Sequence, residues 1–214
     1  MKPKSKVAAA LPLILLAACS KSPEATAPAP SGVVTPAVVP TPDKPHTLVP
    51  ADFATLKLGA RLMSADNVTK FVADGQTIAE AASYVACPQK MTQCDPKSLP
   101  PGTVYTYVHR VTPGKHVASA TLFRTARPAA GFANGVGYDE AEAVAALGPN
   151  GEIDVEADNG ALVWRVVGGD GWKDGEPITF YWQSTLPPAA QPLEAYLVET
   201  DGSVAIGSGP FPRN

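Results

Sequence analysis

The stretch EIDVEADNGALVWRVV, residues 152–167, decides the fold. At its centre, Asn159-Gly160 is the dipeptide that most strongly favours a two-residue type I′ turn, and apolar and polar residues alternate on both sides of it. A two-residue turn sets the register, so that Val155 faces Trp164. One face of the predicted hairpin is apolar and the other is charged, as an antiparallel sheet with one buried face requires.

Strand-like composition recurs along the chain. Pro113-Gly114 predicts a turn, with a longer loop as the alternative because a type II turn splays a hairpin, and Asp201-Gly202 predicts another. Short strands separated by turns favour a single antiparallel β-sandwich-like domain that is mainly β. The expected strands, besides the hairpin above, are residues 103–112 and 116–126, 177–185, and 193–200 and 203–206.

One or two short helices are expected beside the strands. Residues 139–147 are the clearest helix, because Asp139 can cap its first turn and Gly148-Pro149 can end it. The run from Thr77 to Glu80 resembles a capping box, and a second short helix over residues 77–85 is therefore predicted.

The N-terminal segment has the pattern of an export signal. Three lysines precede an apolar run over residues 7–16, which is too short for a membrane-spanning helix of roughly 20 residues. The run ends in Leu16-Ala17-Ala18-Cys19, an aliphatic residue, two small residues and a cysteine. This pattern resembles the lipobox of bacterial lipoproteins; the alternative is an ordinary secretory signal with an incidental cysteine.

The lipobox resemblance implies a membrane anchor. Cleavage would follow Ala18, and Cys19 would carry a diacylglycerol thioether as the acylated first residue. Multiple acyl chains give stable anchoring, which a single chain does not. Ser20 follows the cysteine, which resembles lipoproteins sent to an outer membrane. The expected location is therefore the cell envelope, on the outer membrane and facing the periplasm or the cell surface.

Composition divides the chain into three segments. Residues 1–18 are the expected signal peptide, and residues 19–50 are the lipidated cysteine followed by a Pro/Ala-rich linker. Such a linker cannot bury a core, so it is expected to be a disordered, extended tether. Residues 51–214 form the expected globular domain, which is long enough for a core of its own.

Cysteine usage and charge limit the chemistry of the mature chain. Cys87 and Cys94 are an even pair in an exported protein, which is typical of a disulfide, and their C-x₆-C spacing differs from zinc and redox motifs.

Removing residues 1–18 takes away three of 17 basic residues and none of the 20 acidic ones, which leaves a formal charge of −6. That balance disfavours nucleic acid and anionic lipid headgroups as partners.

Three groups of residues are candidate sites. One face of the predicted hairpin carries an acidic stripe together with Arg165, which partly balances its charge: Glu152, Asp154, Glu156 and Asp158. Alternate strand residues lie about 6.6 Å apart, which favours a solvated sheet face over a calcium site. Trp172, in a Gly-rich loop with Asp170 and Asp174, is either a stacking platform for a sugar or partner or a lid that folds back on the core. The third group is His109 and His116, with Tyr105 and Tyr107 alongside; they could begin a metal site but lack a visible third ligand, so no metal and no cofactor is predicted.

The absence of catalytic motifs favours a non-enzymatic protein. The sequence contains no G-x-S-x-G, no H-E-x-x-H and no phosphate-binding loop. The expected function is therefore a lipid-anchored envelope protein that presents a β-rich binding or structural domain to an envelope protein or a glycan. The alternative is a periplasmic hydrolase of glycan or peptide that uses carboxylates of the 152–158 strand.

Overall fold

The computed structural model describes residues 45–62 and 66–213. The expected signal peptide, Cys19 and most of the linker lie outside these residues. Within the described ranges, no helix is long and apolar enough to cross a bilayer.

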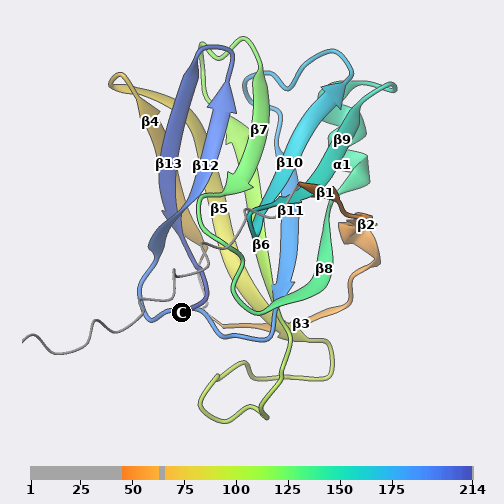
Figure 1. Ribbon diagram of the computed structural model, residues 1–214, viewed down its shortest axis with the longest axis vertical. Helices are drawn as coiled ribbons and strands as arrows, with labels where there is room; N and C mark the ends of the chain where they lie inside the picture. The colour runs from red at the N-terminus through yellow and green to blue at the C-terminus, as the bar shows by residue number, and fades with distance from the viewer. Residues whose placement is uncertain (1–44, 63–65, 214) are drawn as a thin grey trace, which may run out of the picture. The chain divides into compact units, whose positions relative to one another are not determined.

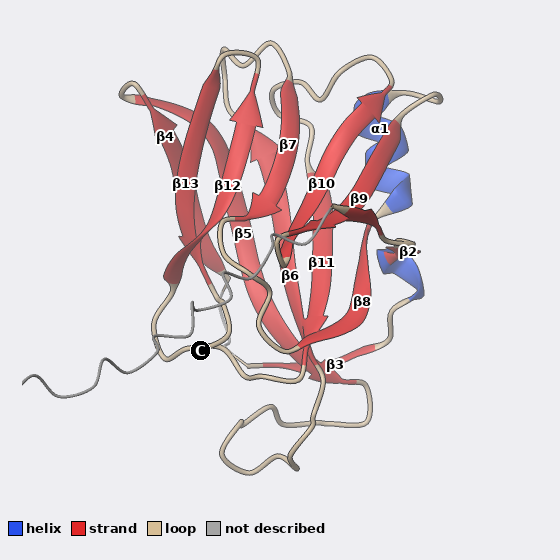
Figure 2. Ribbon diagram, viewed as in Figure 1, coloured by secondary structure: helices blue, strands red, loops and turns tan. Residues whose placement is uncertain are grey.

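Two packed β-sheets make up the described domain, and strands are its main secondary structure (Figures 1 and 2). The six-stranded sheet has the order β1 (His46–Thr47), β9 (Glu152–Asp158), β10 (Ala161–Gly168), β7 (Ala120–Thr125), β12 (Leu193–Thr200) and β13 (Ser203–Gly209). The seven-stranded sheet has the order β2 (Ala51–Asp52), β8 (Phe132–Tyr138), β11 (Ile178–Ser184), β6 (Tyr105–Pro113), β5 (Gln76–Pro88) and β3 (Leu58–Arg61), and β4 (Asn67–Ala73) also pairs with β5. The predicted mainly β, sandwich-like domain is confirmed.

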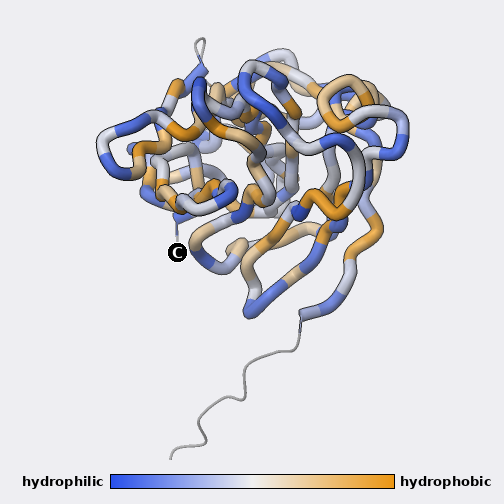
Figure 3. Tube along the Cα trace, turned by 90° about the horizontal axis from the view of Figure 1, so that it is seen from above, coloured by the Kyte–Doolittle hydropathy of each residue, from blue (hydrophilic) through white to orange (hydrophobic). Residues whose placement is uncertain are grey.

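The core between the sheets is rich in aromatic side chains. Phe123 of the six-stranded sheet lies 5.1 Å from Phe180 of the seven-stranded sheet, between ring centroids, and 5.6 Å from Trp164. All three side chains are at most 1% exposed. Along β9, the buried Ile153 and Val155 alternate with the less buried Asp154 and Glu156, so one face of this strand lies in the core. Hydrophobic and hydrophilic residues are mixed over the coloured part of the chain trace in Figure 3.

The hairpin predicted around Asn159-Gly160 is confirmed in its register. Val155 pairs with Trp164, and Asp154 pairs with Arg165. The indole N–H of Trp164 donates to the Gly137 carbonyl at 3.0 Å, which joins the hairpin to the opposite sheet. The strand predicted at 177–185 and the hairpin around Asp201-Gly202 are present as β11 and β12–β13.

The helix predicted at residues 139–147 is confirmed as α1 (Glu140–Leu147). The Asp139 side chain caps it by accepting a hydrogen bond from the Glu142 N–H at 2.9 Å. Gly148 ends it with a φ of 82°, a conformation that favours glycine. α1 and the short 3₁₀ helix Phe53–Thr55 lie along the same side of the sandwich (Figure 2).

The helix predicted over residues 77–85 is wrong, because this segment lies inside the 13-residue strand β5. β5 pairs with β4 and β3 on one side and with β6 on the other. Sheet pairing satisfies its backbone on both edges, which outweighs the weak helical preference of its alanines and of the apparent capping box.

The hairpin predicted from residues 103–112 and 116–126 is also wrong. Both strands exist, as β6 and β7, but they belong to different sheets. The Gly114 N–H donates to the Ile78 carbonyl of β5 at 2.8 Å, so the chain turns across the end of the sandwich. The Pro-Gly pair therefore begins the longer loop that was the alternative.

The domain begins before the expected boundary at residue 51. β1 pairs with β9, and the Leu48 N–H donates to the Val155 carbonyl at 2.8 Å. Residues 46–48, which composition assigns to the linker, therefore extend the six-stranded sheet.

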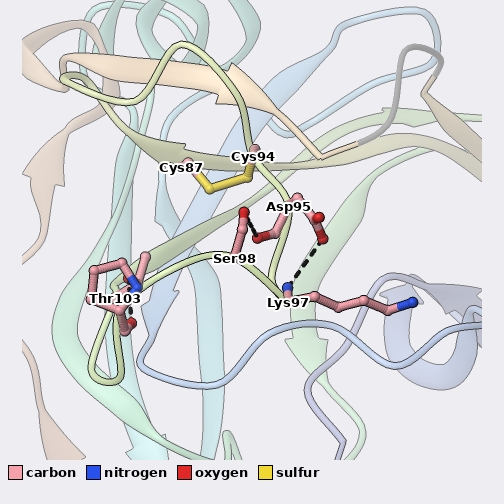
Figure 4. Close-up of a disulfide and its surroundings, with 7 residues drawn as sticks. Cys87, Cys94, Asp95, Lys97, Ser98 and Thr103 are labelled. Carbon is pink, nitrogen blue, oxygen red and sulfur yellow. Dashed lines mark hydrogen bonds between the residues drawn. A yellow bond between two sulfur atoms is a disulfide. The ribbon is translucent and has the colours of Figure 1, made fainter.

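The predicted disulfide joins Cys87, at the end of β5, to Cys94 in the following loop (Figure 4). Their Cα atoms are 5.7 Å apart, and neither residue is more than 9% exposed. After Cys94, the Asp95 side chain accepts a hydrogen bond from the Lys97 N–H at 3.0 Å. This bond forms a local turn next to the loop that the disulfide closes.

Candidate functional site

A groove of about 670 Å³ lies at the end of the sandwich where the β4–β5 turn meets the β6–β7 loop, within the range of small-molecule sites. We call it the His116 groove. Its polar and charged lining residues are Lys70, Gln76, Thr77, Glu80, Thr112, Lys115, His116 and Asp174. This end of the domain is uppermost in Figure 1 and faces the viewer in Figure 3.

The floor of the groove is one row across three strands of the seven-stranded sheet. Lys70 of β4 pairs with Glu80 of β5, and Glu80 pairs in turn with Thr112 of β6. Lys70 and Glu80 are exposed. Because cross-strand partners share a face, all three side chains point to the outer surface of the sheet.

Gly114 allows the β6–β7 loop to form one wall of the groove. A Cβ atom at this position would lie 2.2 Å from the Thr77 carbonyl oxygen, so only glycine lets the loop approach β5 so closely. The Gly175 N–H donates to the Pro113 carbonyl at 3.1 Å and brings Asp174 to the same site.

His116 has a left-handed backbone, with a φ of 76°. The other non-glycine residues with positive φ in the described ranges are Asp74, Asn134 and Asn159, whose short polar side chains tolerate this conformation best. Strained backbone of this kind is concentrated at functional sites. The exposed His116 imidazole is therefore carried by a strained backbone conformation.

Both signs of charge line the groove. Lys70 and Lys115 are basic and Glu80 and Asp174 are acidic, and none of them forms an ion pair within 4.0 Å among the described residues. No aromatic side chain apart from the His116 imidazole is among the described residues that line it. The groove thus offers hydrogen-bonding and charged groups, with little surface for stacking.

A smaller hollow of about 150 Å³ adjoins the groove. Lys115 and His116 line both spaces, and Thr200 and Asp201 add the β12–β13 turn to the smaller one. His116 therefore lines two depressions, and the smaller one also includes residues of the other sheet.

Only one of the three residues predicted for binding in the Gly-rich loop lies at the groove. Asp174 lines it, whereas the Asp170 N–H donates to the Leu147 carbonyl at 2.8 Å, at the end of α1. Trp172 is 1% exposed, and its indole N–H donates to the Glu176 carbonyl at 2.6 Å. Its ring packs edge-on against Phe180, so Trp172 is the lid on the core and not a platform for a ligand.

The acidic stripe lies on the outer face of the six-stranded sheet, away from the groove. Asp154 pairs with Arg165, and Asp158 lies 3.8 Å from the Arg124 guanidinium. Within the described ranges, no group of three or more His, Cys, Asp or Glu side chains is placed to hold a metal ion. The stripe therefore has the geometry of a solvated sheet face.

The predicted neighbourhood of His109 and His116 is wrong. His109 is fully buried between the sheets, its ring centroid is 4.2 Å from that of Tyr196, and burial lowers its pKa to about 3. His116 is exposed on the loop beyond β6. The two lie apart because residues 103–126 do not form a hairpin.

Sequence reasoning missed Lys70, Glu80 and Lys115 as site residues. No local motif connects them, because they meet only when β4, β5 and the β6–β7 loop come together. The one sequence signal for this site was Pro113-Gly114, which begins the loop that carries Lys115 and His116 but was interpreted as a hairpin turn. Comparisons with protein-family models, curated proteins and solved structures find no match to this chain.

Proposed function

We propose that this chain is a lipid-anchored protein of the bacterial cell envelope whose β-sandwich is a binding module, and that the His116 groove holds its ligand. The lipobox resemblance at Cys19 supports the anchor. The observation that carries the binding role is the groove itself, which gathers Lys70, Lys115, Glu80 and Asp174 without ion-pair partners among the described residues.

Of the two expected partner classes, the groove favours a polypeptide. A peptide segment carries donors, acceptors and charges of both signs, which complement a groove of mixed charge. Sugar rings are commonly held by stacking on large aromatic side chains, and the one candidate for that role, Trp172, is buried in the core. The partner is therefore proposed to be a charged segment of another envelope protein.

The hydrolase alternative gains no support from this geometry. Its carboxylates lie along the solvated face of β9, and none of them lines the His116 groove. A hydrolytic site would need an acid and a base that converge on one bound substrate.

Photo-crosslinking in cells tests the binding proposal. A benzoyl-phenylalanine at position 115, in the full-length lipoprotein, is expected to give a discrete adduct whose tryptic digest contains peptides of a second protein. The matched control is position 49, where Val49 is 91% exposed and lies between β1 and β2, which are edge strands of the two sheets and contribute no lining residue to the groove. Adducts of equal yield from both positions, or an adduct whose added mass is removed by glycan hydrolases, would contradict a peptide ligand in the groove.

The anchor is tested separately at Cys19. Cys19→Ala is expected to abolish incorporation of an alkyne-labelled fatty acid and to release the protein from the membrane fraction. Cys19→Ser serves as a second variant that keeps the polarity of the position. Fatty-acid labelling that persists in either variant would refute lipidation at Cys19.

A further inference from the structure

A second hollow, of about 410 Å³, lies at the other end of the sandwich. β7 runs from the loop that carries His116 to the segment that carries Arg127, so the two sites lie beyond opposite ends of one strand. We call the second site the Arg127 hollow. It is lined by two arginines and one amide, Arg127, Arg213 and Gln191, and by apolar residues that include Leu193 and Pro212.

Arg127 is held in place at both its main chain and its side chain. Its Nε–H donates to the Glu194 carbonyl at 3.1 Å. Its own carbonyl accepts from the Thr125 hydroxyl at 2.8 Å, and that hydroxyl also accepts from the Leu162 N–H at 2.9 Å. No bond to the terminal nitrogens of the Arg127 guanidinium is formed by the described residues, so these nitrogens can donate to a ligand.

The opposite wall of the hollow is built on the core. Phe211 is 1% exposed, and its ring centroid lies 5.4 Å from that of Trp182. The Ala189 N–H donates to the Phe211 carbonyl at 2.8 Å, and Pro188 forms a bridge with Pro212. Arg213 therefore follows directly on a segment that is fixed to the sheets.

The charge of the Arg127 hollow is of one sign. No carboxylate is among the described residues that line it, and neither Arg127 nor Arg213 forms an ion pair with any of the described residues. Two guanidinium groups without an ion-pair partner among the described residues raise the local positive potential of a concave site, although acidic residues outnumber basic ones in the whole chain. Guanidinium groups match the paired oxygens of carboxylates and phosphates.

We propose that the Arg127 hollow binds a small organic anion, in which a phosphate or carboxylate is carried on an apolar group. The oxyanion lies between Arg127 and Arg213 and accepts their free N–H donors. The Gln191 amide supplies a further donor, and the apolar part lies against Leu193 and Pro212. This site is independent of the His116 groove and of the peptide ligand proposed there.

Calorimetric titration of the full-length chain in detergent with phenyl phosphate tests the proposal, with inorganic phosphate as the comparison ligand. Saturable binding is expected, tighter for phenyl phosphate than for inorganic phosphate. Arg127→Gln and Arg213→Gln should each weaken it about tenfold or more, since a charge-assisted hydrogen bond is lost. Arg127→Lys keeps the charge but not the planar fork, and a smaller loss is expected.

The controls separate this site from overall charge and from the groove. Arg165→Gln removes the same charge from the outer face of β10, and Lys115→Gln alters the groove; both should leave the affinity unchanged. Dihexanoyl phosphatidylglycerol, below its micelle concentration, distinguishes a lipid headgroup from a soluble anion by its affinity relative to phenyl phosphate. The proposal fails if phenyl phosphate does not saturate, if it binds no tighter than inorganic phosphate, or if Arg127→Gln and Arg213→Gln bind it as the unmodified chain does.

Discussion

The Nδ1 atom of His109 lies 2.9 Å from the hydroxyl oxygen of Ser83, its partner across the β5–β6 pair, and both side chains are buried. The other ring nitrogen, Nε2, has no hydrogen-bond partner among the described residues. The imidazole therefore stays neutral in the folded protein, because a charged ring would have neither water nor a carboxylate to stabilise it.

Stability should fall in acid because of His109. Its pKa is about 3 in the folded chain and about 6.5 when unfolded, so the unfolded state binds more protons between these pH values. The free energy of unfolding should then decrease by about 1.4 kcal/mol for each pH unit below 6.5, or by about 2 kcal/mol from pH 7 to pH 5. Urea unfolding at these two pH values measures it.

His109→Leu removes the titrating group and should flatten this pH dependence, whatever its effect on stability at pH 7. An equal slope in the His109→Leu variant would show that other groups cause the acid sensitivity.

Gly114→Ala should destabilise the domain and disrupt the groove together. The added Cβ would meet the Thr77 carbonyl oxygen at 2.2 Å, so the β6–β7 loop must move away from β5. The expected loss is about 2–3 kcal/mol, in the range of overpacked sites, with loss of the crosslink from position 115. Gly202→Ala is the matched control: its φ is 103° but nothing lies within 4 Å, so backbone strain alone should cost about 1 kcal/mol.

His116→Gly should separate stability from binding. Glycine relieves the strain of a φ of 76°, so the free energy of unfolding should rise by about 0.5–1 kcal/mol after the entropy cost of glycine is subtracted. The same variant lacks the imidazole and should lose the crosslink of the groove. His116→Ala keeps the strain and should lose the crosslink without the gain in stability. If the His116→Gly protein retains full crosslinking, the imidazole does not contribute to binding in the groove.

The disulfide should contribute moderately to stability. Cys87→Ser with Cys94→Ser opens a loop of sequence separation 7, for which chain entropy gives a loss of about 2–3 kcal/mol. In the unmodified protein both cysteines should resist alkylation until a reductant is added, as mass spectrometry would detect. Ready alkylation of the native protein would be incompatible with the Cys87–Cys94 bond.

The parts of the fold that the sequence predicts are those set by neighbours in the chain. Asn159-Gly160 imposes the hairpin register because only two residues separate its strands, and Asp139 caps α1 from three residues away. Such interactions need no knowledge of the rest of the fold. The strand β11 and the β12–β13 hairpin were predictable for the same reason.

The errors occur where distant pairing decides the structure. Thr77 to Val85 looks helical in isolation, but it becomes strand because β4 and β6 pair on its two sides. β6 and β7 were expected to pair with each other, yet β6 pairs with β5 and β11 in the opposite sheet. The His116 groove depends on both of these arrangements, and its residues could not be brought together by local reasoning.

Because β1 pairs with β9 over only two residues, it should detach first when the N-terminal side of the domain is pulled. A pull on the chain ahead of His46 acts first on the two residue pairs of β1 with β9 and on the bond from Leu48 to Val155. These few hydrogen bonds break before the pulling force reaches the long strands of the core. Their release frees residues 46–50 and lengthens the attachment by roughly 15 Å, at about 3.3 Å per residue, while the aromatic core stays closed. β1 can therefore act as a small extensible joint that absorbs displacement before the sandwich is strained.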